Sequence, residues 1–220
     1  MIARQLITDE IMHLKTSDTG KTALSWMDEY KVSHLPIVNN EDFLGLISEQ
    51  DIYSFNNLTE PLGNHTLSLK NPFVSEHEHV YNVLKIIDEL KLTVIPVLDD
   101  HNKYLGCITI SRLVNYLSST YSIANPGGII VLEMSEKDYS LTELSNIVES
   151  NNARVLSLFL SSHVDSTKLE VVIKVNRIDI GSILQTFDRY GYYVKATYGE
   201  DEDTEDLKDR YDAFMNYLNM

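Results

Sequence analysis

The sequence lacks most of the features of a secreted or membrane-spanning protein. It holds one cysteine in 220 residues, which excludes an internal disulfide and a zinc site built from several cysteines. Every apolar run is shorter than the roughly 18 residues that a transmembrane helix needs. The first ten residues also lack the apolar core of a signal peptide. We therefore expect a cytoplasmic protein with no membrane partner.

Positive charge is scarce. The chain has 18 Lys and Arg residues against 33 Asp and Glu residues, a formal net charge of −15. Binding to a nucleic-acid backbone requires stripes of basic side chains that neutralise phosphates, so we expect no nucleic-acid partner. Six of the seven residues from 200 to 206 are acidic, and we interpret this run as a solvated connector.

Motifs of the common enzyme classes are also missing. The sequence has no G-x-S-x-G elbow, no P-loop and no G-x-G-x-x-G run, so we expect no enzyme activity. His77-Glu78-His79, with His65 nearby, contains metal-ligand residue types. This stretch falls on the expected turn before a helix, where solvated polar residues are common, so no metal site is predicted. Cys107 lies in an apolar run and is expected to be a small buried hydrophobe.

The sequence contains an internal repeat. The run Val32–Val38 resembles Leu92–Leu98, so that Pro36 and Pro96 lie 60 residues apart. The segment before each run places apolar residues at the i, i+1, i+4, i+7 spacing of one helix face. These residues are Ala23, Leu24, Met27 and Tyr30 in the first copy, and Val83, Leu84, Ile87 and Leu90 in the second.

The repeat continues beyond a polar turn. Residues 39–42 and 99–103 form the two turns, after which Phe43–Ser48 matches Tyr104–Thr109 at an offset of 61. A short helix is expected after each match, at 49–55 and 110–117. Each copy is therefore predicted to contain helix, strand, turn, strand and helix. Two copies related by a pseudo-two-fold axis are expected to bury one shared core.

The repeated segment resembles the cystathionine-β-synthase (CBS) domain family. The resemblance rests on the apolar-Pro-apolar run around Pro36 and on the Gly-x-x-Ser-x-x-Asp run from Gly45 to Asp51. It covers residues 1–120, with repeats at about 6–58 and 66–119. It implies a tandem pair, or Bateman module, whose clefts often hold AMP, ADP, ATP or S-adenosylmethionine. It therefore implies a regulatory ligand sensor rather than an enzyme.

The resemblance also assigns roles to individual residues. Asp51 would accept hydrogen bonds from the two ribose hydroxyls, since a carboxylate offers two acceptor oxygens to a vicinal diol. Ser48 would meet a phosphate at the junction of strand and helix. The same two residues also match a helix N-terminal cap, and capping alone explains both. The predicted ligand-binding residues of the first copy are Ser33, His34, Pro36, Gly45, Ser48 and Asp51.

The second copy departs from the family pattern. Thr109 replaces Ser48, a conservative change, but Arg112 stands where the first copy has Asp51. Arginine has no acceptor for ribose hydroxyls. The second site is therefore either lost, or Arg112 faces a phosphate in the neighbouring cleft. We keep Thr109 and Arg112 as candidate ligand-binding residues and expect two unequal clefts.

The C-terminal part begins after a linker. Residues 121–128 contain Asn125-Pro126-Gly127-Gly128, which is typical of a connector. Periodicity within the domain expected at 129–198 predicts the order β-α-β-β-α-β of a ferredoxin-like fold. The predicted strands cover 129–134, 155–160, 169–175 and 192–198, and the predicted helices follow Ser140 and Ile180.

This order resembles the ACT family of small regulatory domains, which often bind amino acids. ACT amino-acid sites usually carry a glycine in the loop after the first strand, and residues 135–140 have none. The domain is therefore an amino-acid sensor or has a structural, dimerising role. A CBS pair followed by an ACT-like domain resembles the acetoin-utilisation type B proteins in architecture.

The last segment, 199–220, combines the acidic run with an amphipathic pattern. Leu207, Tyr211, Phe214 and Leu218 would share one helix face, which must pack on its own domain or on a second subunit. The sequence thus leaves two main hypotheses. One is a homodimeric sensor of an adenosyl ligand, and the other is a ligand-free scaffold for assembly.

Overall fold

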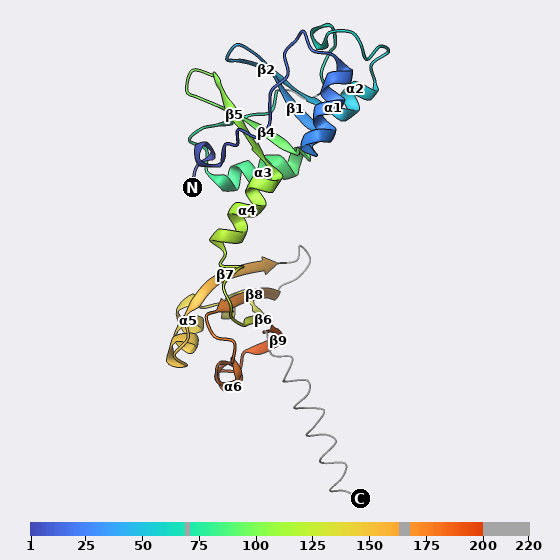
Figure 1. The fold of residues 1–220 in the computed structure, drawn as a ribbon. Coiled ribbons are helices and arrows are strands. Elements are labelled where there is room, and N and C mark those ends of the chain that lie inside the picture. The colour runs from blue at the N-terminus through green and yellow to red at the C-terminus, as the bar shows by residue number, and fades with distance from the viewer. Residues whose placement is uncertain (69–70, 163–167, 200–220) are drawn as a thin grey trace, which may run out of the picture. The chain divides into compact units, whose positions relative to one another are not determined.

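The computed structural model describes residues 1–68, 71–162 and 168–199. The chain divides into one compact unit at Met1–Leu117 and a second that starts at Ser118 (Figure 1). Among the described residues, no helix is both long and apolar enough to cross a membrane. The predicted acidic run and the predicted amphipathic helix around Tyr211 lie outside the described residues.

The first unit contains the two copies of the repeated element, in the order that the sequence predicts. A short 3-10 helix at Ala3–Leu6 precedes them. The first copy consists of α1 (Gly20–Tyr30), β1 (His34–Asn39), β2 (Asp42–Ser48) and α2 (Glu49–Tyr53). After a second 3-10 helix at Leu62–Asn64, the second copy consists of β3 (Val74–Ser75), α3 (Val80–Leu90), β4 (Val94–Leu98), β5 (Tyr104–Thr109) and α4 (Ile110–Thr120).

The two copies share their strand pairing. β1 pairs with β2 and β4 with β5, both antiparallel. β3 adds a parallel strand beside β4, with Val74 opposite Val97. In the first copy an isolated parallel bridge between Leu14 and Ile37 takes the same place. Two residues are too short for a period-two pattern to show, so sequence periodicity missed this third strand.

The copies bury a shared core, as the repeat predicted. Leu46 of the first copy packs in one cluster with Val97 and Ile108 of the second. Ile47 packs in another cluster with Val94 and Cys107. Cys107 is fully buried and free. Because each cluster draws on both copies, neither copy buries its apolar residues alone.

The segments that precede the helices cross between the copies. Ile7 packs over Gly106 of the second copy, where an added Cβ would lie 2.5 Å from its Cγ2 atom. Leu67 packs over Gly45 of the first copy, where an added Cβ would lie 2.6 Å from its Cδ1 atom. Residues 7 and 67 are themselves 60 positions apart, so these contacts follow the repeat.

The second unit has the element order β-α-β-β-α-β. Its elements are β6 (Ile129–Ser135), a 3-10 helix (Glu136–Asp138), α5 (Leu141–Ser150), β7 (Val155–Ser162), β8 (Lys168–Val175), α6 (Gly181–Arg189) and β9 (Tyr193–Tyr198). The strands form one antiparallel sheet in the order β7-β8-β6-β9. Alternate residues of β6 and β8 pack against Ile147 of α5 and Phe187 of α6 in a single core.

Candidate functional site

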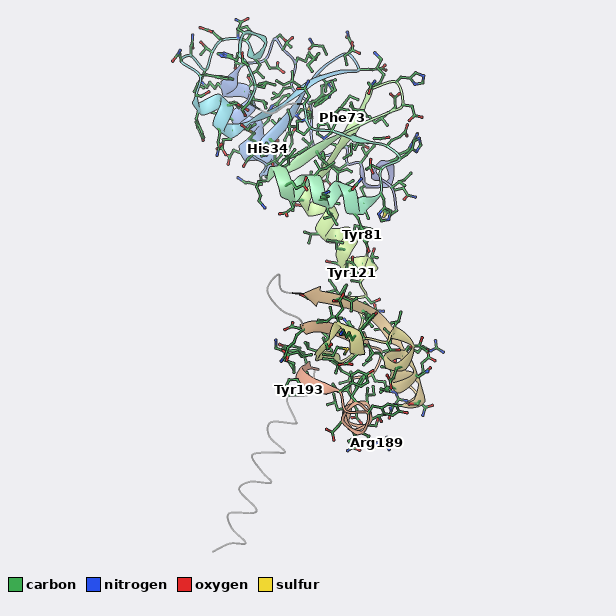
Figure 2. The ribbon with its side chains drawn as sticks, turned by 180° about the vertical axis from the view of Figure 1, so that it is seen from behind. His34, Phe73, Tyr81, Tyr121, Arg189 and Tyr193 are labelled. Carbon is green, nitrogen blue, oxygen red and sulfur yellow. The ribbon has the colours of Figure 1, made fainter. Side chains whose placement is uncertain are left out.

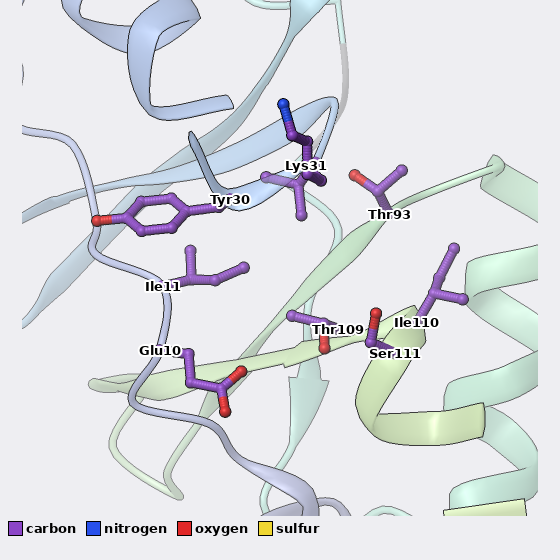
Figure 3. A pocket seen from close by; sticks show the side chains of 9 residues that line it. Glu10, Ile11, Tyr30, Lys31, Thr93, Thr109, Ile110 and Ser111 are labelled. Atoms are coloured by element: carbon purple, nitrogen blue, oxygen red, sulfur yellow. The ribbon is translucent and has the colours of Figure 1, made fainter. Parts of the chain in front are cut away.

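Two clefts lie where the copies meet, one on each side of the starts of β1 and β4. The first cleft has a volume of about 350 Å³ and the second about 440 Å³. Figure 3 shows the second cleft. Thr93 contributes to both, and equivalent lysines, Lys91 and Lys31, line the first and the second respectively. The first cleft is lined by Ser33, His34, Ser48, Glu49, Gln50, Ser68, Leu90, Lys91 and Thr93.

His34 links the two copies at the first cleft and is labelled in Figure 2. Its Nδ1 atom accepts the backbone N–H of Thr93 at 3.2 Å and lies 3.0 Å from the Thr93 hydroxyl. The Thr93 hydroxyl oxygen in turn accepts the backbone N–H of Ser33 at 2.9 Å. Because Nδ1 is an acceptor, the ring proton of neutral His34 resides on Nε2. His34 therefore offers a hydrogen-bond donor to the cleft.

The protonation of His34 should make stability depend on pH. Burial lowers the pKa of His34, and the nearby charge of Asp51 opposes this effect only in part. The unfolded chain, with an ordinary histidine pKa of about 6.5, then binds the proton more readily. We expect the contribution of neutral His34 to the free energy of unfolding to be fully present above pH ~6.5. It should be lost as the pH falls towards the lowered pKa of His34.

Urea unfolding at a series of pH values checks this prediction. In His34→Asn, the side-chain oxygen can still accept the Thr93 N–H but does not titrate, so part of the loss of stability at low pH should disappear. His101→Asn, at an exposed histidine of the β4–β5 turn, is the control and should retain the full loss. Identical pH profiles for both variants would contradict the assignment to His34.

Asp51 is buried and hydrogen-bonded by its own chain. Its Oδ2 atom accepts the backbone N–H of Ser48 at 2.9 Å and the Ser48 hydroxyl at 2.6 Å. Its Oδ1 atom accepts the backbone N–H of Ser68 at 3.0 Å. Burial alone would raise the pKa of Asp51, but these hydrogen bonds outweigh it and hold the pKa below its ordinary value. The carboxylate is therefore ionised.

The capping interpretation of Ser48 and Asp51 describes what the structure contains. Ser48 is the N-cap of α2, and its hydroxyl oxygen accepts the backbone N–H of Asp51 at 3.0 Å. Asp51 itself is not among the residues that line the first cleft, but its partners Ser48 and Ser68 are. The carboxylate thus lies behind the cleft wall. Its acceptor positions are taken up by groups of Ser48 and Ser68.

The other predicted residues of the first copy divide into two groups. Ser33, His34 and Ser48 line the first cleft. Pro36 and Gly45 are buried in strands and line neither cleft. The prediction that Gly45 contacts a ligand needs correction, because Leu67 fills the space beside it.

The acidic side chain at the second cleft comes from a different part of the chain than the acidic side chain at the first cleft. Thr109 lines it and caps α4, accepting the backbone N–H of Arg112 at 3.1 Å. The Arg112 side chain is exposed and does not line the cleft. The acidic residue here is Glu10, from the N-terminal segment, opposite Thr109 (Figure 3).

Sequence reasoning missed several lining residues. Lys91, Ser68 and Thr93 are absent from the predicted set, although all three line the first cleft. The repeat offered a signal for one of them, because Thr93 occupies the position 60 residues after the predicted Ser33. The position of Ser68 depends on the path of the connection between the copies, and that path has no sequence signature.

Residues with metal-ligand chemistry gather at the ends of β3 and β4. Glu76, His77 and Asp100 place possible ligand atoms within 4.8 Å of one another. Glu76 is also paired with Arg4. His65, the nearby histidine in the sequence, instead stacks on Phe55 with the ring centroids 3.6 Å apart.

Comparison with known proteins identifies the repeated element. Residues 3–56 and 67–119 match the model of the CBS domain. The inosine-5'-monophosphate dehydrogenase of Methanocaldococcus jannaschii is 25% identical over 113 residues, which are 51% of this chain and 23% of that enzyme. This chain therefore matches about a quarter of the length of the enzyme.

Two solved structures are similar in fold. One is a CBS domain pair/ACT domain protein from Thermotoga maritima, with 20% identity, a TM-score of 0.49, and coverage of 54% of this chain and 98% of that one. The other is CBSX2 in complex with AMP, with 22% identity, a TM-score of 0.46, and coverage of 54% and 96%. Because the CBS family model matches both copies, residues 3–56 and 67–119 are a tandem pair of CBS domains.

Proposed function

We propose that this chain is a non-catalytic regulatory protein that binds an adenosyl ligand in the first cleft. The observation that carries the proposal is the first cleft itself, where His34 presents an N–H donor beside Ser48, with the ionised Asp51 carboxylate directly behind. Its volume of about 350 Å³ suits a small molecule. The resemblance to CBS pairs that hold AMP, ADP, ATP or S-adenosylmethionine supports this ligand class.

Each part of such a ligand has a partner of suitable chemistry. The Nε2–H of His34 can donate to a ring nitrogen of adenine. The ammonium group of Lys91 at the cleft edge can attract a phosphate or a carboxylate. A ribose hydroxyl can reach Asp51 by replacing the Ser48 hydroxyl that now donates to it.

Thermal unfolding with AMP, ADP, ATP and S-adenosylmethionine tests the proposal. A ligand at 100 times its Kd stabilises the folded state by about 2.7 kcal/mol. This corresponds to a rise in Tm of roughly 5 to 10 °C for a chain of this size. If none of the four compounds at millimolar concentration moves the unfolding curve, the proposal fails.

A matched pair of variants tells the two clefts apart. Lys91 and Lys31 are both left-handed C-caps of equivalent helices, and each contacts an aspartate three residues earlier. Asparagine tolerates this backbone conformation. We expect Lys91→Asn to weaken binding of the phosphorylated ligands about fivefold, the value of an exposed ion pair. Lys31→Asn should leave it unchanged, and the reverse result would move the ligand to the second cleft.

A ligand-free scaffold is the second candidate function. It is favoured by the internal hydrogen bonds of Asp51 and by Arg112 at the equivalent position of the second copy. This candidate predicts a homodimer whose unfolding is indifferent to nucleotides, so a monomer by light scattering would count against it.

The β-α-β-β-α-β order and antiparallel sheet of the second unit support the further proposal that it is a ferredoxin-like, ACT-like domain.

A further inference from the structure

A second kind of cavity lies within the C-terminal unit. It has a volume of about 560 Å³ and is formed by the loop after β6 and by the turn between α6 and β9. Four tyrosines line it, Tyr139, Tyr190, Tyr192 and Tyr193, the last of which is labelled in Figure 2. We name this space the tyrosine cavity. The chain has 13 tyrosines in all, so nearly a third of them meet here.

The four rings differ in how much of their surface the protein covers. The rings of Tyr192 and Phe187 are in a T-shaped arrangement with their centroids 5.8 Å apart, and the Tyr192 hydroxyl donates to Glu143 at 2.8 Å. Tyr139 packs against the core of the unit. Tyr190 is 60% exposed and Tyr193 is 63% exposed. These two rings therefore have free surface with which to contact a ligand.

The polar lining of the tyrosine cavity is predominantly acidic. Three acidic residues, Glu133, Asp138 and Glu143, line it together with one lysine, Lys137. Glu133 is paired with Lys168 and Lys195 of the neighbouring strands. Within the part of the chain that the structure describes, Asp138 and Glu143 have no ion-pair partner. The two carboxylates outweigh the single positive charge of Lys137 and give the cavity a negative potential.

The pKa of Tyr192 is consistent with a negative potential in the cavity. Burial, the hydrogen bond to Glu143, and the negative charges of Glu143 and Asp138 together raise the pKa of Tyr192 to about 12. The part of this rise that comes from the charges of Glu143 and Asp138 reflects a negative potential, which favours a cation. Aromatic faces combined with nearby carboxylates are the chemistry by which proteins hold ammonium groups.

We propose that the tyrosine cavity binds a small organic cation with an apolar, alkylated ammonium group. The ring faces of Tyr190 and Tyr193 would contact the alkylated nitrogen, and Asp138 and Glu143 would supply the counter-charge. An amino acid fits less well, because its carboxylate would approach the same two acidic side chains. This site is independent of the CBS clefts and of the ligand proposed for them.

Three compounds with similar bulky heads and different charges test the proposal on the full chain. They are choline, which is a cation, glycine betaine, which is a zwitterion, and 3,3-dimethyl-1-butanol, which is the neutral analogue of choline. Titrations are followed by NMR of the tyrosine ring protons. We expect saturable binding of choline and roughly 5- to 30-fold weaker binding of the neutral alcohol, since the cation–π term reaches roughly 1 to 2 kcal/mol. Betaine should also bind more weakly than choline.

A matched pair of tyrosine variants locates the site. Tyr193→Leu should weaken choline binding about fivefold or more. Tyr198→Leu should leave it unchanged, because Tyr198 lies on the same strand, is equally exposed at 61%, and does not line the cavity. Both residues are on the surface, so both variants should fold. Absence of saturable choline binding, equal affinity for the neutral alcohol, or equal weakening by the two variants would overturn the proposal.

Discussion

Replacing Gly106 with alanine is expected to lower the free energy of unfolding of the CBS pair by about 2 to 4 kcal/mol. Two independent features make this glycine necessary. Its backbone φ angle is 147°, a conformation that residues with a side chain rarely adopt. An added Cβ would also lie 2.5 Å from the Cγ2 atom of Ile7, inside van der Waals contact. The segment that crosses from the first copy would have to move.

Gly45→Ala is the matched comparison, because Gly45 holds the equivalent position in the first copy. Its backbone φ is not in the left-handed region, and its close neighbour is the flexible end of Leu67. We therefore expect a smaller loss, on the order of 1 kcal/mol. Urea denaturation followed by circular dichroism measures both. Equal losses would show that steric contact dominates and that the φ angle of Gly106 contributes little.

The second large effect is expected from Asp51→Ala, with a loss of about 2 to 3 kcal/mol. The substitution removes a buried carboxylate that accepts three hydrogen bonds from Ser48 and Ser68. It leaves the backbone N–H of Ser48, which is buried, without this partner. It also releases the connection between the two copies from the start of α2. Arg112→Ala, at the equivalent position of the second copy, should cost less than about 0.5 kcal/mol because its side chain is exposed.

The contribution of Asp51 should depend on pH in a defined direction. Its pKa in the folded state lies below that of an unfolded aspartate, about 3.9. The unfolded state therefore binds the proton more readily, so the stabilisation is complete above pH ~4 and is lost as the pH falls through the lowered pKa. The free energy of unfolding, measured with urea at pH 7 and at pH 3, should change less between the two pH values in Asp51→Ala than in the wild type. An unchanged difference would contradict the prediction.

This structural role changes how Asp51 is to be tested in ligand binding. A variant that loses both stability and affinity does not tell direct contact with a ribose from support of the cleft wall. His34 and Lys91 line the first cleft directly. Variants at these two positions therefore report on the ligand more cleanly than variants at Asp51.

The repeat in the sequence was sufficient to predict the first unit and its shared core. Apolar periodicity located α1, α3 and all four long strands of the CBS pair, because burial on one face leaves a pattern of period 3.6 or 2. The same reasoning yielded the element order of the second unit. Both N-caps that it identified, Ser48 and Ser140, accept backbone N–H groups as expected. The elements and their caps depend on contacts between residues close in the sequence, and the shared core followed from the duplication.

Contacts between distant segments were decided only by the tertiary structure. No local pattern indicates that Ser68 donates to Asp51, that Thr93 fixes the tautomer of His34, or that Leu67 covers Gly45. The tyrosine cavity likewise joins residues some 50 positions apart, from the loop after β6 and the turn before β9. The sequence by itself determined which residues are buried and in which elements, since local periodicity encodes burial. The tertiary structure decided which polar groups meet, because such pairs depend on the path of the chain between elements.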